Sequence, residues 1–166
     1  MKLIVIISTF LCLIFTSVNA QSSSLVSLEE KKEKITLEER EYLDYLIYDV
    51  PSSLSFYEEQ VVRDIRKEKS IQTVEFDNVA LLENIKNKKY KKDFNTACLL
   101  MVRWEKGDDL NLTKEQLKEF KSLKFLLIKS YQPVNKQLEN YFTKHIKLED
   151  RAIEIEVLYT YIGEEF

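Results

Sequence analysis

Residues 36–50 read TLEEREYLDYLIYDV and combine the two sequence signals of an α-helix, a start signal and a periodic apolar face. Thr36, followed three residues later by Glu39, fits a capping box, in which a hydroxyl and a carboxylate satisfy free backbone N–H groups. Leu43, Leu46 and Ile47 then recur at helical spacing. This stretch therefore predicts a helix that buries one face.

Similar signals recur along the rest of the chain. Capping boxes also fit at three other hydroxyl residues: Ser27, Ser55 and Thr113. Apolar side chains keep helical spacing over five further stretches: 54–65, 90–101, 117–131, 134–142 and 155–162. We expect Pro133 to open one of these helices at its first position and Gly163 to cap the last.

The composition favours the same fold class. Two prolines and two glycines in 166 residues leave few tight turns for a β-sandwich or barrel. The consecutive apolar residues 125–128 indicate a helix that is covered on more than one side, while 68–77 is expected to be a connecting loop. We predict an all-α fold, an irregular bundle of six to eight helices, with a possible internal apolar cavity.

The first twenty residues predict a secretory signal peptide. Lys2 supplies a positive charge, residues 3–15 are almost wholly apolar, and Val18-Asn19-Ala20 provides small residues at a cleavage site. A membrane anchor would need roughly 18 or more apolar residues. We therefore expect residues 21–166 to form a single, secreted, extracellular domain.

Charge and cysteine content limit the partners and the chemistry. Loss of Lys2 leaves 24 basic against 28 acidic residues, a net charge of −4, which predicts no nucleic-acid partner. Cys12 leaves with the signal peptide, so Cys98 is the one remaining cysteine and no intramolecular disulfide can form. We expect Cys98 to be a buried structural thiol.

The sequence offers little for catalysis, and we predict that the protein is not an enzyme. His145 is the only histidine, so no multi-histidine metal site can be built, and we expect it at the C-terminal end of a helix. No G-x-S-x-G elbow is present, and Gly107 and Gly163 alone cannot form a phosphate loop. Asp108 and Asp109 after Gly107 predict a turn. We expect no catalytic residues, no metal and no cofactor.

A basic run and a neighbouring apolar stripe suggest a ligand site. Lysines at 86, 88, 89, 91 and 92 surround Tyr90, and they form either a solvated helix end or a cationic gate. In the second case, Phe94 and Met101 would hold an apolar tail, and Lys88 or Lys91 would meet a carboxylate headgroup or make transient contact with a membrane surface. Asn111-Leu112-Thr113 is a glycosylation sequon, with Asn111 as the possible acceptor.

Four segments between residues 50 and 133 follow one another in an order that a known family shares. They are Val50-Pro51-Ser52-Ser53-Leu54 with Phe56-Tyr57, Val61-Val62-Arg63-Asp64-Ile65, Leu81-Leu82-Glu83-Asn84-Ile85-Lys86-Asn87-Lys88, and Lys118-Glu119-Phe120 followed by Pro133. The resemblance is to the nematode fatty-acid- and retinol-binding family. It implies a helical bundle whose internal cavity binds fatty acids or retinol. Cys98, Trp104 and about thirty residues before the first segment depart from the family.

Two functions from different classes follow. The first is a secreted carrier of a small lipid, a fatty acid or a retinoid, with a hollow apolar core. The alternative is a secreted helical interaction protein or antigen with a solid core and no small ligand. The sequence does not separate them, because both need the same apolar stripes.

Overall fold

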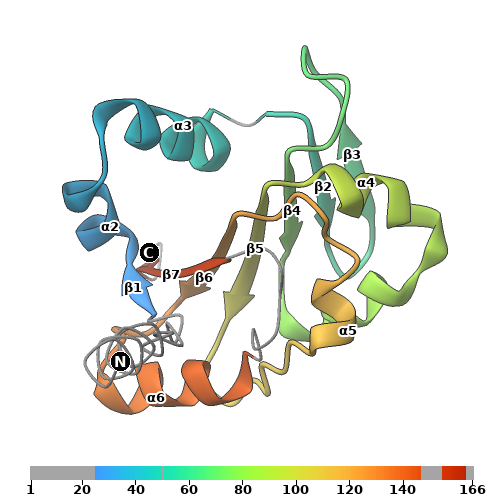
Figure 1. The fold of residues 1–166 in the computed structure, drawn as a ribbon. Coiled ribbons are helices and arrows are strands. Elements are labelled where there is room, and N and C mark those ends of the chain that lie inside the picture. Colours follow the sequence, from blue (N-terminus) through green and yellow to red (C-terminus); the bar gives the residue numbers. More distant parts are fainter. Residues whose placement is uncertain (1–24, 50, 147–154, 164–166) are drawn as a thin grey trace, which may run out of the picture.

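The computed structural model describes residues 25–49, 51–146 and 155–163, and a seven-stranded β-sheet forms the centre of this described part (Figure 1). The order across the sheet is β1-β7-β6-β5-β4-β2-β3. Neighbouring strands are parallel except β2 and β3, which form an antiparallel hairpin. The strands are β1 (Val26–Ser27), β2 (Ser53–Phe56), β3 (Val61–Asp64), β4 (Thr73–Phe76), β5 (Leu99–Trp104), β6 (Phe125–Ser130) and β7 (Glu156–Tyr161).

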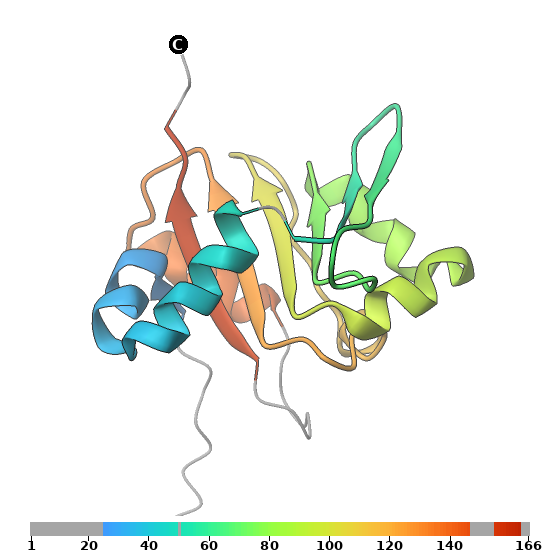
Figure 2. The same cartoon turned by 90° about the horizontal axis from the view of Figure 1, so that it is seen from above.

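Helical segments lie on both faces of the sheet (Figures 1 and 2). One face is covered by η1 (Val79–Lys86), η2 (Lys88–Tyr90), α4 (Lys91–Thr96), α5 (Lys114–Leu117) and α6 (Lys136–His145), where η marks a 3-10 helix. The other face is covered over β5, β6 and β7 by α2 (Leu28–Lys34) and α3 (Leu37–Tyr48). The sheet is therefore a middle layer between two sets of helices.

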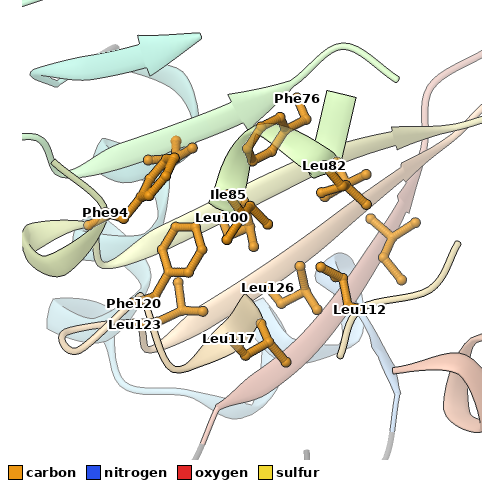
Figure 3. Packing of buried hydrophobic residues seen from close by; sticks show 14 of the residues in the cluster. Phe76, Leu82, Ile85, Phe94, Leu100, Leu112, Leu117, Phe120, Leu123 and Leu126 are labelled. Atoms are coloured by element: carbon orange, nitrogen blue, oxygen red, sulfur yellow. The ribbon is translucent and has the colours of Figure 1, made fainter. Parts of the chain in front are cut away.

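The larger core lies between the sheet and the segments η1 to α6, and it consists of buried aromatic and aliphatic side chains (Figure 3). Phe56 and Phe76 stack at 4.6 Å between ring centroids, and Phe94 lies 5.0 Å from Phe120. All four rings are at most 1% exposed. Leucines from the strands and from the helices point into the same space, so aromatic and aliphatic packing holds this face together.

The smaller core lies under α2 and α3. Leu43 and Leu46 of α3 pack with Leu99 and Met101 of β5 and with Leu127 of β6, and all are nearly or fully buried. Leu99 and Met101 alternate along β5 with Leu100 and Val102, which belong to the larger core. This two-sided burial explains why β5 and β6 are almost continuously apolar.

One apolar pattern repeats from strand to strand. Val74, Leu100 and Leu126 are adjacent in the ladder, as are Phe76, Val102 and Ile128, and 26 residues separate successive members. Each pair is preceded, three residues earlier, by another fully buried apolar residue: Ile71, Ala97 or Leu123. Leu54 with Phe56 and Val157 with Tyr159 extend the same two rungs to both sides. From β4 to β7 the chain therefore advances one strand at a time in a solenoid-like path, whereas β1 lies beyond β7 at the edge of the sheet.

The prediction of an all-α bundle is wrong. Residues 125–128, interpreted as a buried helix, form β6, and the last stretch, 155–162, contains β7. Periodicity alone does not distinguish a short apolar run of a buried strand from a buried helix. The stretches 54–65, 90–101 and 117–131 each mix strand with helix or turn, and residues 73–76 of the expected loop are β4.

The helix-start signals predicted the observed helices more accurately than the apolar periodicity did. Ser27, Thr36 and Thr113 are N-caps whose side chains accept backbone N–H bonds, and the last two form complete capping boxes. Ser55 instead lies inside β2. Pro133 precedes the N-cap Asn135 of α6 and does not occupy the first helical position, and Gly163 follows a strand.

The predicted signal peptide, residues 1–20, lies outside the described residues. In the described part of the chain, no helix is long and apolar enough to cross a membrane.

Candidate functional site

An open pocket of about 690 Å³ lies at the carboxyl ends of β5, β6 and β7. Because these strands are parallel, their last residues and the loops that follow meet at one edge of the sheet. The volume falls within the roughly 300–1,000 Å³ of ligand sites in proteins. The lining residues are Arg103, Glu105, Lys106, Lys129, Tyr131, Gln132, Ile162 and Gly163, and we call this site the carboxyl-end pocket.

Two cations stand side by side in its wall. Arg103 on β5 and Lys129 on β6 are direct partners in the parallel ladder, so both side chains leave the same face of the sheet. Two residues earlier on the same strands, Met101 and Leu127 are also direct partners in the ladder, and both are apolar. Like charges on neighbouring strands destabilise a sheet unless other groups compensate them.

Two carboxylates behind the pocket provide that compensation. Lys129 Nζ lies 2.8 Å from Glu75 Oε1, and Arg103 Nε lies 3.9 Å from the same oxygen. Arg103 Nη1 lies 2.8 Å from Asp77 Oδ1. Glu75 is on β4 and Asp77 directly follows it, so the adjacent strand supplies both acids. The four residues form a charge network with no net charge.

Arg103 is incompletely bonded within this network. Arg103 Nε and Asp77 Oδ1 are both buried atoms without a hydrogen-bond partner. The short contact between Arg103 Nη1 and Asp77 Oδ1 is an ion pair whose angles do not suit a hydrogen bond. Burial lowers the pKa of Arg103, but nearby Asp77, Tyr131 and Glu75 raise it by more. The pKa therefore lies above its usual value, and the guanidinium stays charged. An N–H donor that is buried and unsatisfied costs free energy, so the network is not fully satisfied.

Polar groups of the loops complete the pocket. At the end of β6, Ser130 Oγ donates to Gln132 O at 2.7 Å and accepts from Gln132 N at 3.1 Å, which fixes the turn that carries Tyr131. Arg103 Nη1 lies 3.5 Å from Tyr131 Oη. Lys106 adds a third cation on the loop after β5, and Glu105 an acid. The lining is suited to an anionic group held between cations and a phenol.

A second pocket, of about 520 Å³, shares Lys106 and Gln132 with the first. Trp104, Pro133 and Tyr141 contribute to its wall. The polar atoms of both aromatic residues are engaged: Trp104 Nε1 and Tyr141 Oη donate to Asp108 O at 3.2 and 3.0 Å. Since Arg103 and Trp104 are consecutive on β5, the two pockets flank opposite sides of the same edge.

A second polar cluster is structural. Glu68 accepts hydrogen bonds from Tyr45 Oη, from Ser52 N at 3.2 Å and from Ser52 Oγ at 2.9 Å. The bond from Tyr45 contributes most to lowering the pKa of Glu68 to about 2, and the same bond raises the pKa of Tyr45 to about 12. These bonds tie α3 to the start of β2 and to the segment after β3.

The residues predicted to hold a lipid are not brought together. Phe94 is fully buried in the larger core, whereas Met101 is in the smaller core on the opposite face of the sheet. The helical spacing that linked them ends with α4 at Thr96. Lys88 and Lys91 are exposed, and Lys91 Nζ lies 3.3 Å from Glu119 Oε2.

The other singled-out residues are engaged in local structure. Asn111 is exposed, so glycosylation there stays a prediction, and the hydroxyl of its sequon's Thr113 caps α5. His145 ends α6 as expected, with Nδ1 2.8 Å from Tyr141 O. Cys98 is half-buried before β5, with Sγ 3.8 Å from Gln72 Oε1. No acidic, cysteine or histidine cluster suited to a metal occurs among the described residues.

The sequence interpretation missed Arg103 and Lys129. Each is the first charged residue after an apolar run, Leu99–Val102 and Phe125–Ile128. Interpreted as parallel strands, the two runs would have placed these charges at one sheet edge. Because both runs were interpreted as helices, the shared position of the two charges was not predicted.

Comparisons with protein-family models, with curated proteins and with solved structures gave no match. The resemblance to the fatty-acid- and retinol-binding family therefore stays a prediction, although its expected helical bundle disagrees with the fold.

Proposed function

We propose that the protein is a non-enzymatic, secreted binding module that holds an acidic group of its ligand in the carboxyl-end pocket. The observation that carries the proposal is the adjacent pair Arg103 and Lys129 in the pocket wall, with the third cation Lys106 beside them. A ligand carboxylate could accept from the Arg103 guanidinium or from Lys129, and Lys106, which lies outside the neutral network, would balance its charge. Charge-assisted hydrogen bonds of this kind are among the stronger polar contacts in proteins.

The solenoid-like path supports a recognition role. In each turn of this path, a second apolar residue follows the first by three positions and a third follows two positions later. This spacing, with one strand and one helical segment per turn, is similar to that of leucine-rich repeats. Solenoids of this type present extended surfaces to partners. In this chain α2 and α3 cover part of one sheet face, and the carboxyl-end pocket stays open.

Carriage of a fatty acid or retinoid stays a prediction. The separation of Phe94 from Met101 on opposite faces of the sheet argues against the tail site deduced from the sequence. The alternative function, a secreted interaction protein, needs no such tail site. A fatty acid nevertheless carries a carboxylate, so oleate belongs in the test.

The test is fluorescence anisotropy with labelled hexaglutamate at low salt, with labelled hexalysine as the probe of opposite charge. Arg103→Gln and Lys129→Gln should each weaken hexaglutamate binding by about tenfold, since a charge-assisted hydrogen bond contributes roughly 1.5–3 kcal/mol. Lys92→Gln, an exposed lysine on α4, is the matched control and should bind like the wild type.

Three results decide the proposal. Equal binding by wild type, Arg103→Gln and Lys129→Gln would reject the pocket as the site, provided that the variants melt near the wild type. Binding of hexalysine but not hexaglutamate would reject the ligand class. Saturable binding of oleate that is insensitive to Arg103→Gln would favour a lipid carrier with a different site.

A further inference from the structure

The second pocket has no role in the proposed function, although its volume of about 520 Å³ also falls within the range of ligand sites. It adjoins the carboxyl-end pocket, because Lys106 and Gln132 line both. Arg103 lines the first pocket and Trp104 the second, and these consecutive residues of β5 point to opposite faces of the sheet. A single ligand that crosses this edge of the sheet therefore meets both pockets.

The wall of the second pocket includes a group of large apolar side chains. Trp104 belongs to the larger core, and Leu138 and Tyr141 of α6 pack against that core. The rings of Trp104 and Tyr141 are 6.1 Å apart between centroids. Leu138 and Tyr141 are half-buried and Pro133 is exposed, so part of this apolar surface is open to a ligand.

Most polar atoms beside this surface already have partners within the protein. Trp104 Nε1 and Tyr141 Oη both donate to Asp108 O, and Tyr141 Oη also accepts from Leu110 N at 2.9 Å. Asn135 Oδ1 accepts two backbone N–H bonds at the start of α6, both at 3.0 Å. A sugar would need free donors and acceptors at its hydroxyl groups, whereas an apolar group needs none. The wall therefore suits an apolar group.

The charges of the two pockets also differ. The first contains the cations Arg103 and Lys129, whereas the second contains the acid Asp109, which is exposed. Lys106 is common to both. A carboxylate is therefore favoured in the first pocket and disfavoured in the second, which fixes the orientation of a ligand that carries one acidic and one apolar group.

We propose that the ligand is a peptide segment whose acidic side chain occupies the carboxyl-end pocket and whose neighbouring large apolar side chain occupies the second pocket. This inference rests on the proposed function, because it takes the acid in the first pocket as its starting point. In an extended peptide, successive side chains point to opposite sides, as the two pockets do. One side chain needs only an open pocket of this kind, whereas a long alkyl chain needs an enclosed apolar site.

Fluorescence anisotropy at low salt tests the apolar contact with two labelled hexapeptides of equal charge. One is Glu-Glu-Glu-Trp-Glu-Glu, and the other has serine in place of tryptophan. The wild type should bind the tryptophan peptide at least about tenfold more tightly, since only this peptide buries a large apolar side chain. Arg103→Gln should weaken the binding of both peptides, because both place an acid in the first pocket.

Two variants of α6 locate the contact. Gln137→Trp fills the second pocket from an exposed position in its wall, so it should remove most of the difference between the peptides. Asn140→Trp is the matched control, because Asn140 is exposed on the same helix but does not line the pocket. It should keep the difference. Leu138→Ala shortens the apolar wall and should reduce the difference, provided that the variant melts near the wild type.

The outcomes separate this inference from the proposed function. Equal affinity of the wild type for the two peptides, with both still weakened by Arg103→Gln, would overturn the inference alone. Absence of binding of either peptide would reject the proposed function and the inference together. A preference for the tryptophan peptide that survives Gln137→Trp would show that the apolar side chain binds elsewhere. Binding of the tryptophan peptide that ignores Arg103→Gln would show that the two pockets do not share one ligand.

Discussion

Glu68 illustrates how much one side chain contributes to the joining of elements that are distant in sequence. Its carboxylate accepts from Tyr45 of α3 and from Ser52 before β2. Ser52 is fully buried and also accepts from Arg66 N at 2.7 Å through its hydroxyl. The ionised carboxylate is therefore the form that this cluster stabilises.

We predict that this cluster makes stability depend on pH in the acid range. The pKa of Glu68 is lowered from 4.5 to about 2 in the folded chain, so its contribution is fully present above pH 4.5. It is lost as the pH falls through 2, because the unfolded chain binds the proton first. The difference in the free energy of unfolding between wild type and Glu68→Gln should therefore shrink from pH 5 to pH 2 in urea titrations.

Glu59→Gln is the control for this titration, because Glu59 is exposed in the turn between β2 and β3. Its difference from the wild type should change little over the same range. A constant difference for Glu68→Gln would mean that the cluster does not favour the ionised form.

At the scale of an element, the N-terminus of α3 was predictable from its sequence. Thr36 Oγ1 accepts from Glu39 N at 3.3 Å, and Glu39 Oε2 accepts from Thr36 N at 3.0 Å. Such a motif is local: its partners are three residues apart, so no knowledge of the rest of the chain is needed. The same holds for Thr113 and Gln116 at α5.

The strands were not predictable in this way. Phe125–Ile128 is apolar because one face of β6 meets the larger core and the other meets α2 and α3, which depends on elements far along the chain. The pocket was not predictable for the same reason, because Arg103 and Lys129 become neighbours only through strand pairing. Local signals thus fixed helix starts, whereas the sheet and its site required non-local partners.

We predict that Thr36→Ala destabilises the chain by about 1 kcal/mol, since it removes an N-cap hydroxyl. The helix it starts carries Leu43 and Leu46 over the smaller core, so the loss should appear in the global unfolding transition. Urea unfolding provides the measurement. Leu37→Ala, at a side chain that is 69% exposed in the same turn, should cost distinctly less, and equal costs would argue against the cap.

At the scale of the whole molecule, the strand order sets a gradient of stability across the sheet. β5 and β6 lie between other strands and are covered on both faces, so their amides should open only when most of the chain unfolds. β3 has one paired side and three exposed apolar side chains at and just after it. Local opening there exposes little additional apolar surface.

We therefore predict that hydrogen exchange, followed by NMR in dilute solution, is slowest in β5 and β6 and fastest in β3. The amides of Leu100 and Val102 should exchange more slowly than those of β3 by several orders of magnitude, given a global stability of roughly 5–15 kcal/mol. Within β3, Val62 should be more protected than Arg63, because the Val62 amide is bonded to β2 and the Arg63 amide points outward. Addition of urea should bring the β5 and β6 amides to one common exchange rate as global unfolding takes over. Protection of Arg63 equal to that of Val102 in dilute solution would contradict both the gradient and the free edge.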